Sequence, residues 1–413
     1  GFGSTGEVSW NTTKITADPG PAVSGVGYFT DTSSSAFNVT LPSSPSAGAV
    51  IAVADYANNW GTNNLTILRN GSNIEGSAEN FVCNTNGATI TFVYVDATKG
   101  WVCTNSGNSS EAFGPTFIQA TGGTITECGN CKIHTFTGPG TFTVCQISSC
   151  AANNVVSYVV VAGGGSGGTQ RGGGGGAGGY REVKSPVTPY TASPLDGYSS
   201  APNRVTVTAT AFPITVGGGG PSRASPNNLP NAQSPNGSPS TFSTITSAGG
   251  GFGGNNTPCS HIDGGPGGSG GGAGGQSGAC GGTGNTPPVS PAQGTNGGND
   301  TRPGSPPGEG GGGGGGATAA GVNSVSGNAG TGGAGATSCI TGSPVTRAGG
   351  GGGGTTGSNP QVGSGGSGGG GEGGNAPPGS DGHAGTANTG GGGGGAGSTP
   401  GSSSSGGGGS GIV

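Results

Sequence analysis

The cysteines are the residues whose spacing comes closest to a chemical site in this sequence. The chain has 413 residues and nine cysteines, of which eight fall into neighbouring pairs and Cys339 is left over. The pairs are Cys83 with Cys103, Cys128 with Cys131, Cys145 with Cys150, and Cys259 with Cys280. Disulfides in an oxidising setting and a tetrahedral zinc site both fit such pairs. We favour disulfides, because Gly129-Asn130 is a hairpin-turn dipeptide and the next pair encloses four residues rather than two. No metal is predicted.

Other residues with catalytic potential lack the partners that catalysis requires. Residues 164–168 (GGSGG) match G-x-S-x-G, but a nucleophile elbow needs a following helix with His and acidic partners, and a glycine block follows instead. His134 alternates with apolar residues as on a strand, and His261 lies beside Asp263 in a loop-like insert. No carboxylate pair has a spacing that indicates glycoside hydrolysis. We therefore predict a non-enzymatic protein without cofactors.

Glycine is distributed very unevenly along the chain. Residues 1–162 contain 19 of the 106 glycines and residues 163–413 contain the other 87, in blocks such as 172–176, 310–316 and 390–395. The strict three-residue period of collagen is absent. Two interpretations remain: a disordered tail, or packed polyglycine-II helices that pair through their backbone groups. The second requires a dense, cooperative bundle, because glycine loses the most backbone freedom on ordering.

Charge and hydropathy argue against two classes of partner. The formal net charge is −5 and only 7% of residues are charged, so no basic patch exists for nucleic acid. No stretch approaches the ~20 apolar residues of a membrane-spanning helix, so no membrane insertion is expected. The sequence starts at Gly1 without Met, and we expect a processed product or part of a larger polypeptide.

Residues 1–110 have the pattern of an all-β module. Short apolar or alternating runs are separated by turn signals such as Asn70-Gly71 and Lys99-Gly100, and no helical period is present. We predict a β-sandwich or small barrel of about six to eight strands. The predicted strands lie at residues 27–29, 37–41, 50–54, 65–68, 89–95 and 101–103.

A second β segment and a glycine-rich domain follow. Residues 111–162 predict a connector with a hairpin, 124–128 and 132–136, then a strand at 141–146 and a central apolar strand at 155–162. Residues 163–413 alternate glycine blocks with polar inserts, of which 203–210, 212–216 and 240–247 are strand-like. A flexible linker has no need of such inserts, so we favour a polyglycine-II domain with variable loops. The predicted fold is therefore all-β modules followed by packed polyglycine-II helices, with essentially no α-helix.

Several linked phrases carry a resemblance to known proteins. Residues 133–142 (IHTFTGPGTF), 158–165, 172–182 (GGGGGAGGYRE), 214–220 and 240–251 resemble the glycine-rich receptor-tip module of bacteriophage tail fibres. Residues 39–48, 55–74 and 93–101 are similar to a β-domain in tail fibres of phages from aquatic bacteria. The resemblance implies a virion fibre whose tip folds as layered polyglycine-II helices with loops that touch the host surface. The cysteine pairs depart from that pattern.

The resemblance and the bare glycine framework together place recognition in the loops. The candidate receptor-binding residues are Gln170, Arg171, Tyr180, Tyr190, Tyr198, Asn255 and His261. The expected partners are a bacterial cell-surface glycan or outer-surface protein, and further copies of the chain in a trimer or polymer. One alternative is a subunit of a self-assembling extracellular filament, where N-x-S/T sequons such as the one at Asn64 could carry glycan. Another is an ice-binding protein, although the inserts show no regular Thr face.

Overall fold

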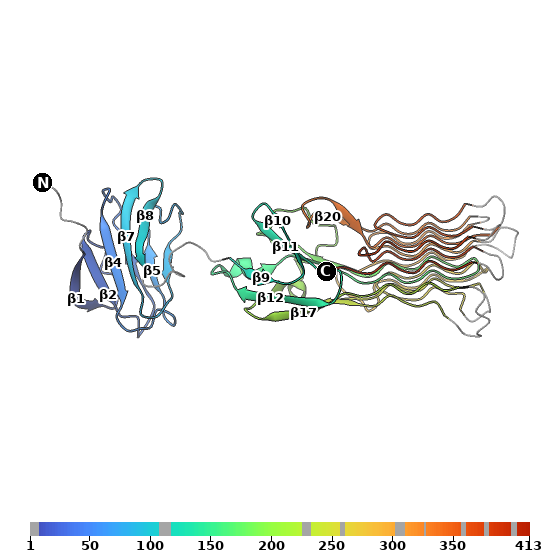
Figure 1. Ribbon diagram of the computed structural model, residues 1–413, viewed down its shortest axis with the longest axis horizontal. Helices are drawn as coiled ribbons and strands as arrows, with labels where there is room; N and C mark the ends of the chain where they lie inside the picture. Colours follow the sequence, from blue (N-terminus) through green and yellow to red (C-terminus); the bar gives the residue numbers. More distant parts are fainter. Residues whose placement is uncertain are drawn as a thin grey trace. The chain divides into compact units, whose positions relative to one another are not determined.

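The structure, a computed structural model, describes residues 8–106, 117–224, 233–256, 261–301, 310–325, 328–356, 361–375, 380–397 and 403–413. The chain folds as two compact units, Gly1–Thr116 and Phe117–Val413, so most of the expected connector at 111–162 lies in the second unit (Figure 1). The only helical elements among the described residues are two short 3-10 turns, Ala151–Asn154 and Ala201–Asn203. The predicted all-β fold class is confirmed.

The first unit packs two sheets against each other. One is mixed, in the order β1-β2-β4-β7-β8, and the other has the order β3-β5-β6. Their bounds are β1 Ser9–Ile15, β2 Val26–Thr30, β3 Phe37–Thr40, β4 Val50–Asp55, β5 Leu65–Leu68, β6 Phe81–Cys83, β7 Thr89–Asp96 and β8 Gly100–Ser106. All six predicted strands are present, and the sequence analysis missed β1 and β6.

Apolar residues from both sheets form one core in this unit. Val39 and Leu65 from the smaller sheet meet Ile51 and Phe92 from the larger one, all fully buried. Trp60 is also fully buried, and its indole N–H donates to Thr30 Oγ1 at 3.0 Å. Burial of each such side chain contributes about 1.5–3 kcal/mol. The alternating patterns in the sequence are those of a sandwich with one face of each sheet inward.

The second unit begins with a base of small sheets. An antiparallel sheet has the order β19-β18-β17-β12-β9, and the remaining strands form the pairs β10-β11, β13-β16, β14-β15 and β20-β21. The bounds are β9 Gln119–Thr121, β10 Thr124–Cys128, β11 Cys131–Thr135, β12 Gly140–Gln146, β13 Val155–Val156, β14 Tyr158–Val161, β15 Tyr180–Val183, β16 Val205–Thr206, β17 Ala211–Thr215, β18 Ser240–Phe242, β19 Ile245–Ser247, β20 Ala336–Ser338 and β21 Val345–Arg347.

Two predicted strands of the base are each divided. Residues 155–162 form β13 and β14, which pair with different partners, β16 and β15. Residues 240–247 form a tight hairpin, β18–β19, because the chain reverses at Ser243, whose φ is 53°. The expectation of one strand in each place was wrong. At residues 240–247 the reason is that apolar residues alternate in the same way on both arms of a short hairpin. The predicted hairpin around Gly129-Asn130 is confirmed, because β10 and β11 are antiparallel and Cys128 lies opposite Cys131 in the strand register.

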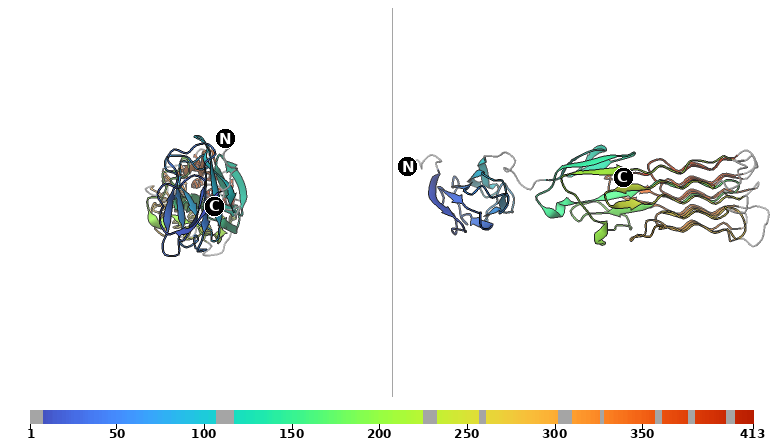
Figure 2. Two further views of the ribbon diagram at one scale, coloured as in Figure 1. Left: turned by 90° about the vertical axis from the view of Figure 1, so that its left-hand side faces the viewer. Right: turned by 90° about the horizontal axis from the view of Figure 1, so that it is seen from below.

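Beyond the base, the glycine blocks run side by side as extended, wave-like segments stacked in layers (Figures 1 and 2). Residues 172–179 form the central run. From Gly173 to Gly178, successive N–H groups donate, at 2.8 to 2.9 Å, to three different neighbours in strict rotation. Gly173 and Gly176 donate to the carbonyl oxygens of Gly254 and Gly251 in one run. Gly174 and Ala177 donate to those of Gly312 and Gly315 in a second run. Gly175 and Gly178 donate to those of Gly393 and Gly390 in a third run. A period of three with hydrogen bonds only between segments is the signature of packed polyglycine-II helices.

The carbonyl groups of the central run complete the lattice. They accept bonds of 2.8 to 3.0 Å from three further runs, through donors that include Gly165, Gly272 and Gly351. Three neighbours accept and three others donate, so six runs surround the central one. The buried backbone groups of this run are thereby satisfied without an apolar core around them.

The bundle starts and finishes at the base. Val161, just before the first run, exchanges two backbone hydrogen bonds with Ile412, just after the last, at 2.8 and 3.0 Å. Val159, Val161, Ala177 and Tyr180 belong to a small apolar cluster at this junction. The chain therefore reverses direction at two places, at the base and at the opposite end of the bundle. We call this opposite end the tip.

Candidate functional site

The tip gathers loops that are far apart in sequence. The first reversal is Thr169–Gln170–Arg171, between the runs 163–168 and 172–179. Gln170 and Arg171 have φ values of 54° and 60°, a left-handed backbone that turns the chain sharply. This reversal lies at the right-hand end of Figure 1, away from the strands.

Asn255 joins three of these loops. Its side-chain oxygen accepts from the Thr169 N–H at 2.8 Å and from Ser234 Oγ at 3.2 Å. Its own N–H donates to the carbonyl oxygen of His261 at 2.8 Å. The carboxamide is buried, so these bonds form away from water and hold the loops at fixed positions.

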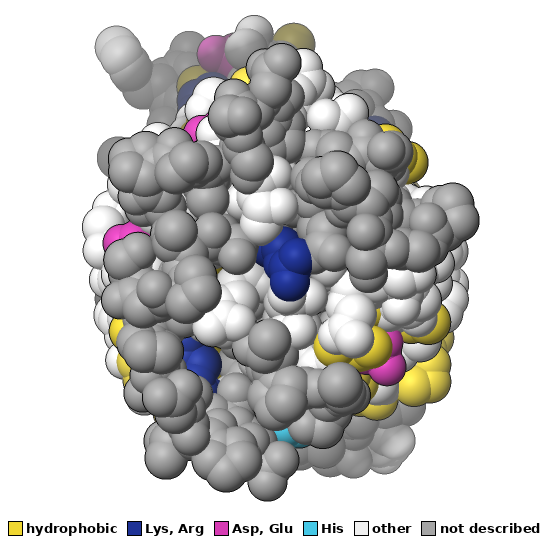
Figure 3. All heavy atoms as spheres, turned by 90° about the vertical axis from the view of Figure 1, so that its right-hand side faces the viewer, with side chains coloured by type: hydrophobic (Ala, Val, Ile, Leu, Met, Phe, Trp, Pro, Cys, Tyr) yellow, Lys and Arg dark blue, Asp and Glu magenta, His cyan; other side chains and the backbone are white. Residues whose placement is uncertain are grey.

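Arg171 is anchored in the same cluster. Its carbonyl oxygen accepts from Gly275 N–H at 2.8 Å. With the Asn256 carboxamide turned so that its oxygen faces the guanidinium, Arg171 Nε donates to that oxygen at 2.8 Å, and Asn256 donates to Gly275 O at 3.1 Å. One cationic side chain lies near the middle of this end in the space-filling view, and another lies towards its lower left (Figure 3). The structure therefore brings four of the seven predicted residues, Gln170, Arg171, Asn255 and His261, to the tip.

The three predicted tyrosines lie at the base instead. The run 172–179 separates Arg171 from Tyr180 by about 28 Å, at ~3.1 Å per residue. Tyr180 is 1% exposed and its hydroxyl donates to Glu182 Oε2 at 2.8 Å, so it contributes no receptor-facing surface. Tyr190 donates to the Val183 carbonyl at 3.3 Å, and the ring of Tyr198 lies 4.5 Å from the guanidinium carbon of Arg204. The sequence analysis placed Tyr180 wrongly because it assigned the non-glycine insert that begins at Tyr180 to the binding loops.

The comparisons with known proteins agree with this architecture. A family model described as a glycine-rich domain matches residues 135–413. The chain belongs to this glycine-rich domain family. The matched residues contain most of the base and all of the glycine blocks. No curated protein matches the sequence.

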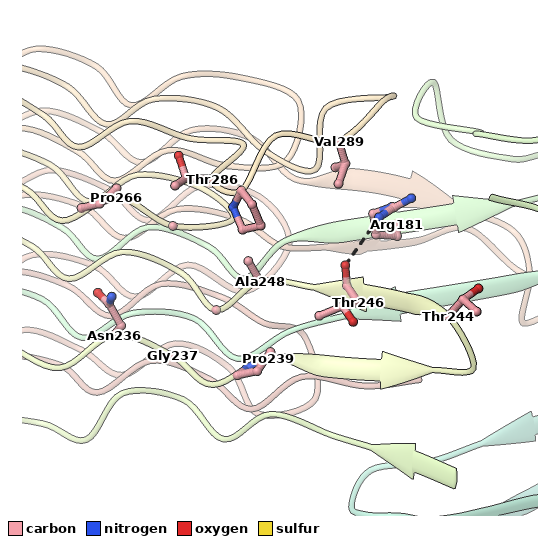
Figure 4. Close-up of a pocket in the computed structure, with 13 residues that line it drawn as sticks. Arg181, Asn236, Gly237, Pro239, Thr244, Thr246, Ala248, Pro266, Thr286 and Val289 are labelled. Atoms are coloured by element: carbon pink, nitrogen blue, oxygen red, sulfur yellow. Dashed lines mark hydrogen bonds between the residues drawn. The ribbon is translucent and has the colours of Figure 1, made fainter. Parts of the chain in front are cut away.

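A groove on the flank of the glycine-rich domain was missed by the sequence analysis. It has a volume of about 550 Å³ and lies where the base strands continue into the runs (Figure 4). Arg181, at its edge, donates to Thr246 O at 3.5 Å and to Asn203 Oδ1 at 2.5 Å. Burial lowers the pKa of Arg181. Asn236, Pro287 and other insert residues form the remaining wall. No sequence signal marks this groove, because its residues come from separate inserts.

Two of the predicted disulfides are not formed, because Cys128, Cys131, Cys145 and Cys150 are free thiols. The predicted pair of Cys259 with Cys280 lies partly outside the described residues. Cys83 and Cys103 are both buried in the core of the first unit, on strands of different sheets. Cys128 and Cys131 face each other across the β10–β11 turn as thiols, and Cys145 and Cys150 are exposed. Sequence proximity predicted pairs here, but it does not fix the bond geometry that a disulfide requires.

The described ranges contain no group of three His, Cys, Asp or Glu residues that could hold a metal ion, so the zinc alternative gains no support. Ser166 of the G-x-S-x-G match is fully buried, and its hydroxyl donates to Pro235 O at 3.1 Å. No helix in this part of the chain is long and apolar enough to cross a membrane.

Proposed function

We propose that this protein is an adhesive fibre component of the phage tail-fibre or adhesin type, and that the tip of its glycine-rich domain binds a bacterial surface glycan or outer-surface protein. The observation that carries the proposal is that backbone hydrogen bonds hold the runs together, while polar side chains lie in the loops at the tip. The runs are fixed by backbone contacts that leave little room for side chains, whereas the described tip residues Arg171, Asn255 and Asn256 carry polar side chains joined to that frame.

The physical argument concerns preorganisation. Asn255 and Asn256 fix the loop containing Gln170 and Arg171 through buried hydrogen bonds. A ligand that binds such loops loses little free energy to ordering them. Carboxamide, hydroxyl and guanidinium groups are donors and acceptors suited to a polar glycan. Loops can therefore vary in sequence to change the receptor while the glycine frame stays constant.

Binding to intact cells tests the proposal. The full chain carrying a fluorescent label is titrated onto a panel of aquatic bacteria and onto their purified surface polysaccharides. Arg171→Asn is the tip variant, because Asn tolerates the left-handed backbone at this position. Arg204→Asn is the matched control, since Arg204 is an exposed arginine at the base.

We expect Arg171→Asn to weaken binding tenfold or more and Arg204→Asn to leave it unchanged. Loss of binding in Arg204→Asn alone would move the site to the base and refute a tip receptor site. Long homopolymers of the purified chain in electron micrographs, without binding to any cell, would favour the extracellular filament instead. Thermal hysteresis of the solution would favour ice binding.

A further inference from the structure

The base of the second unit contains a large cavity at the end of the bundle opposite the tip. Its volume is about 1040 Å³, in the upper range of small-molecule sites. The β10–β11 hairpin, the loop around Tyr190, the β20–β21 turn and the last residues of the chain line it. Much of the wall is apolar, including Ile118, Ile133, Phe136, Val159 and Ile340. A long apolar chain would gain about 0.8 kcal/mol for each methylene group buried against such a wall.

Arg347 lines this cavity and has a buried donor without a partner among the described residues. Its side chain lines the cavity, the residue is only 8% exposed, and no described residue accepts a hydrogen bond from its Nη1. The Thr341 hydroxyl in the same lining is also buried without a partner. Burial lowers the pKa of Arg347, as expected for a cation held away from water. A buried donor that stays unpaired costs free energy, and a bound acceptor would recover it.

A carboxylate close enough to influence Arg347, that of Glu182, is already occupied by other donors. Glu182 Oε2 accepts from the Tyr180 hydroxyl at 2.8 Å and from the Ser193 N–H at 3.0 Å, and Oε1 accepts from Ser338 Oγ at 2.6 Å. Glu182 is near enough to influence Arg347 electrostatically but forms no ion pair with it within 4.0 Å among the described contacts. Arg347 thus has a buried donor that no described residue accepts, on a side chain that lines the cavity.

The charges around the cavity select the sign of the ligand. The described lining includes Lys132 and Arg347 but no aspartate or glutamate. An anion is therefore favoured over a cation, and a guanidinium pairs best with a carboxylate, through two parallel hydrogen bonds. We propose that the cavity binds a long-chain monocarboxylate, a free fatty acid, with its carboxylate on Arg347 and its chain along the apolar wall. This site is separate from the tip and does not depend on the proposed receptor binding.

Displacement of a fluorescent fatty acid tests the inference. The full chain is titrated with cis-parinaric acid, which is then displaced by laurate or by 1-dodecanol. We expect saturation at one probe per chain, displacement by laurate, and at least tenfold weaker displacement by dodecanol, which lacks the carboxylate. Arg347→Gln should weaken probe binding at least tenfold, whereas Arg204→Gln, at an exposed arginine outside the cavity, should not change it.

A second variant covers the case in which Arg347→Gln fails to fold. Ile340→Trp places an indole in the cavity and keeps both cations, so it should abolish probe binding while the melting temperature stays near that of the parent chain. Probe binding that is unchanged in both folded variants, equal displacement by laurate and dodecanol, or no saturable binding to the parent chain would each overturn the proposal.

Discussion

At the scale of a residue, glycine in the runs is a steric requirement. A Cβ on Gly174 would lie 2.0 Å from the carbonyl oxygen of Gly351, and one on Gly175 would lie 2.1 Å from that of Gly165. The atoms in the way are backbone atoms, which cannot move without breaking the hydrogen bonds of a neighbouring run. Ala177 shows the exception: it is fully buried at the apolar junction with Val161 and Tyr180. Glycine is therefore required at those positions of a run that pack against the backbone of a neighbouring run.

Replacing Gly174 with alanine should destabilise the bundle. We expect Gly174→Ala to lower the free energy of unfolding by about 1–3 kcal/mol or more, because the methyl group overlaps a fixed carbonyl. Gly218→Ala is the matched control in another run, since an added Cβ there meets nothing within 4 Å. It should be neutral, or stabilising by roughly 0.4–1 kcal/mol through the unfolded state. Chemical denaturation measures both, and equal effects would contradict the steric argument.

Asp31 should make the stability of the first unit sensitive to acid. Its carboxylate pairs with Lys14 Nζ at 2.5 Å and accepts from the Ser33 N–H at 3.0 Å. These contacts lower its pKa from the usual 3.8 to about 2. A lowered folded-state pKa stabilises the fold above the ordinary value, and this contribution is lost as the pH falls from 3.8 through about 2. We expect Asp31→Asn to be less stable than the parent at pH 5 and the difference to shrink towards pH 2. A difference independent of pH would assign it to another cause.

At the scale of an element, each run is stable only through its neighbours. Polyglycine-II helices have no internal hydrogen bonds, so the run 172–179 depends on the three runs that accept from it and the three that donate to it. A run at the surface has fewer neighbours, and Gly218 is exposed there. Protection should therefore decrease from the centre of the bundle to its edge.

Amide hydrogen exchange measures this gradient. We expect the amides of Gly174, Gly175 and Gly176 to exchange slowly, near the rate set by global unfolding, and that of Gly218 to exchange quickly. Uniformly fast exchange across residues 163–413 would mean that the glycine-rich domain is disordered in solution and would refute the bundle.

Some elements could be predicted from the sequence pattern and others could not. Six of the eight strands of the first unit were predictable, because alternating apolar residues such as those of β7 fill one face of a sheet. β15, β20 and β21 were not, because they are three or four residues long and lie between glycine blocks. At the tip, Arg171 and Asn255 were predicted from their place in loops, but the contact through which Asn255 joins Thr169 crosses 86 positions of sequence and has no local signal.

At the scale of the whole molecule, the chain consists of two units with separate cores. The first is held by one large apolar cluster, and the second by two clusters in its base together with the backbone lattice of the bundle. The two units rely on different physics, because apolar burial weakens on cooling, whereas the lattice consists mainly of hydrogen bonds.

Separation of the two units should leave each folded. We expect calorimetry of the full chain to give two transitions, and a fragment of residues 117–413 to reproduce one of them within a few degrees. Its control is the complementary fragment, residues 1–116, which should reproduce the other. A single cooperative transition in the full chain that is absent from both fragments would show that neither unit is independent.

The sequence by itself determined the composition of the frame: where apolar alternation ends, where glycine blocks begin at residue 163, and that such blocks can order only through their backbone. The tertiary structure decided which loops meet. Polyglycine runs have no side chains to specify a neighbour, so the pairing of Gly174 with Gly312 and of Gly175 with Gly393 depends on how the whole chain is folded back and forth. For the same reason, only the structure divided the predicted residues between tip and base, and only it buried Arg347 beside an apolar cavity.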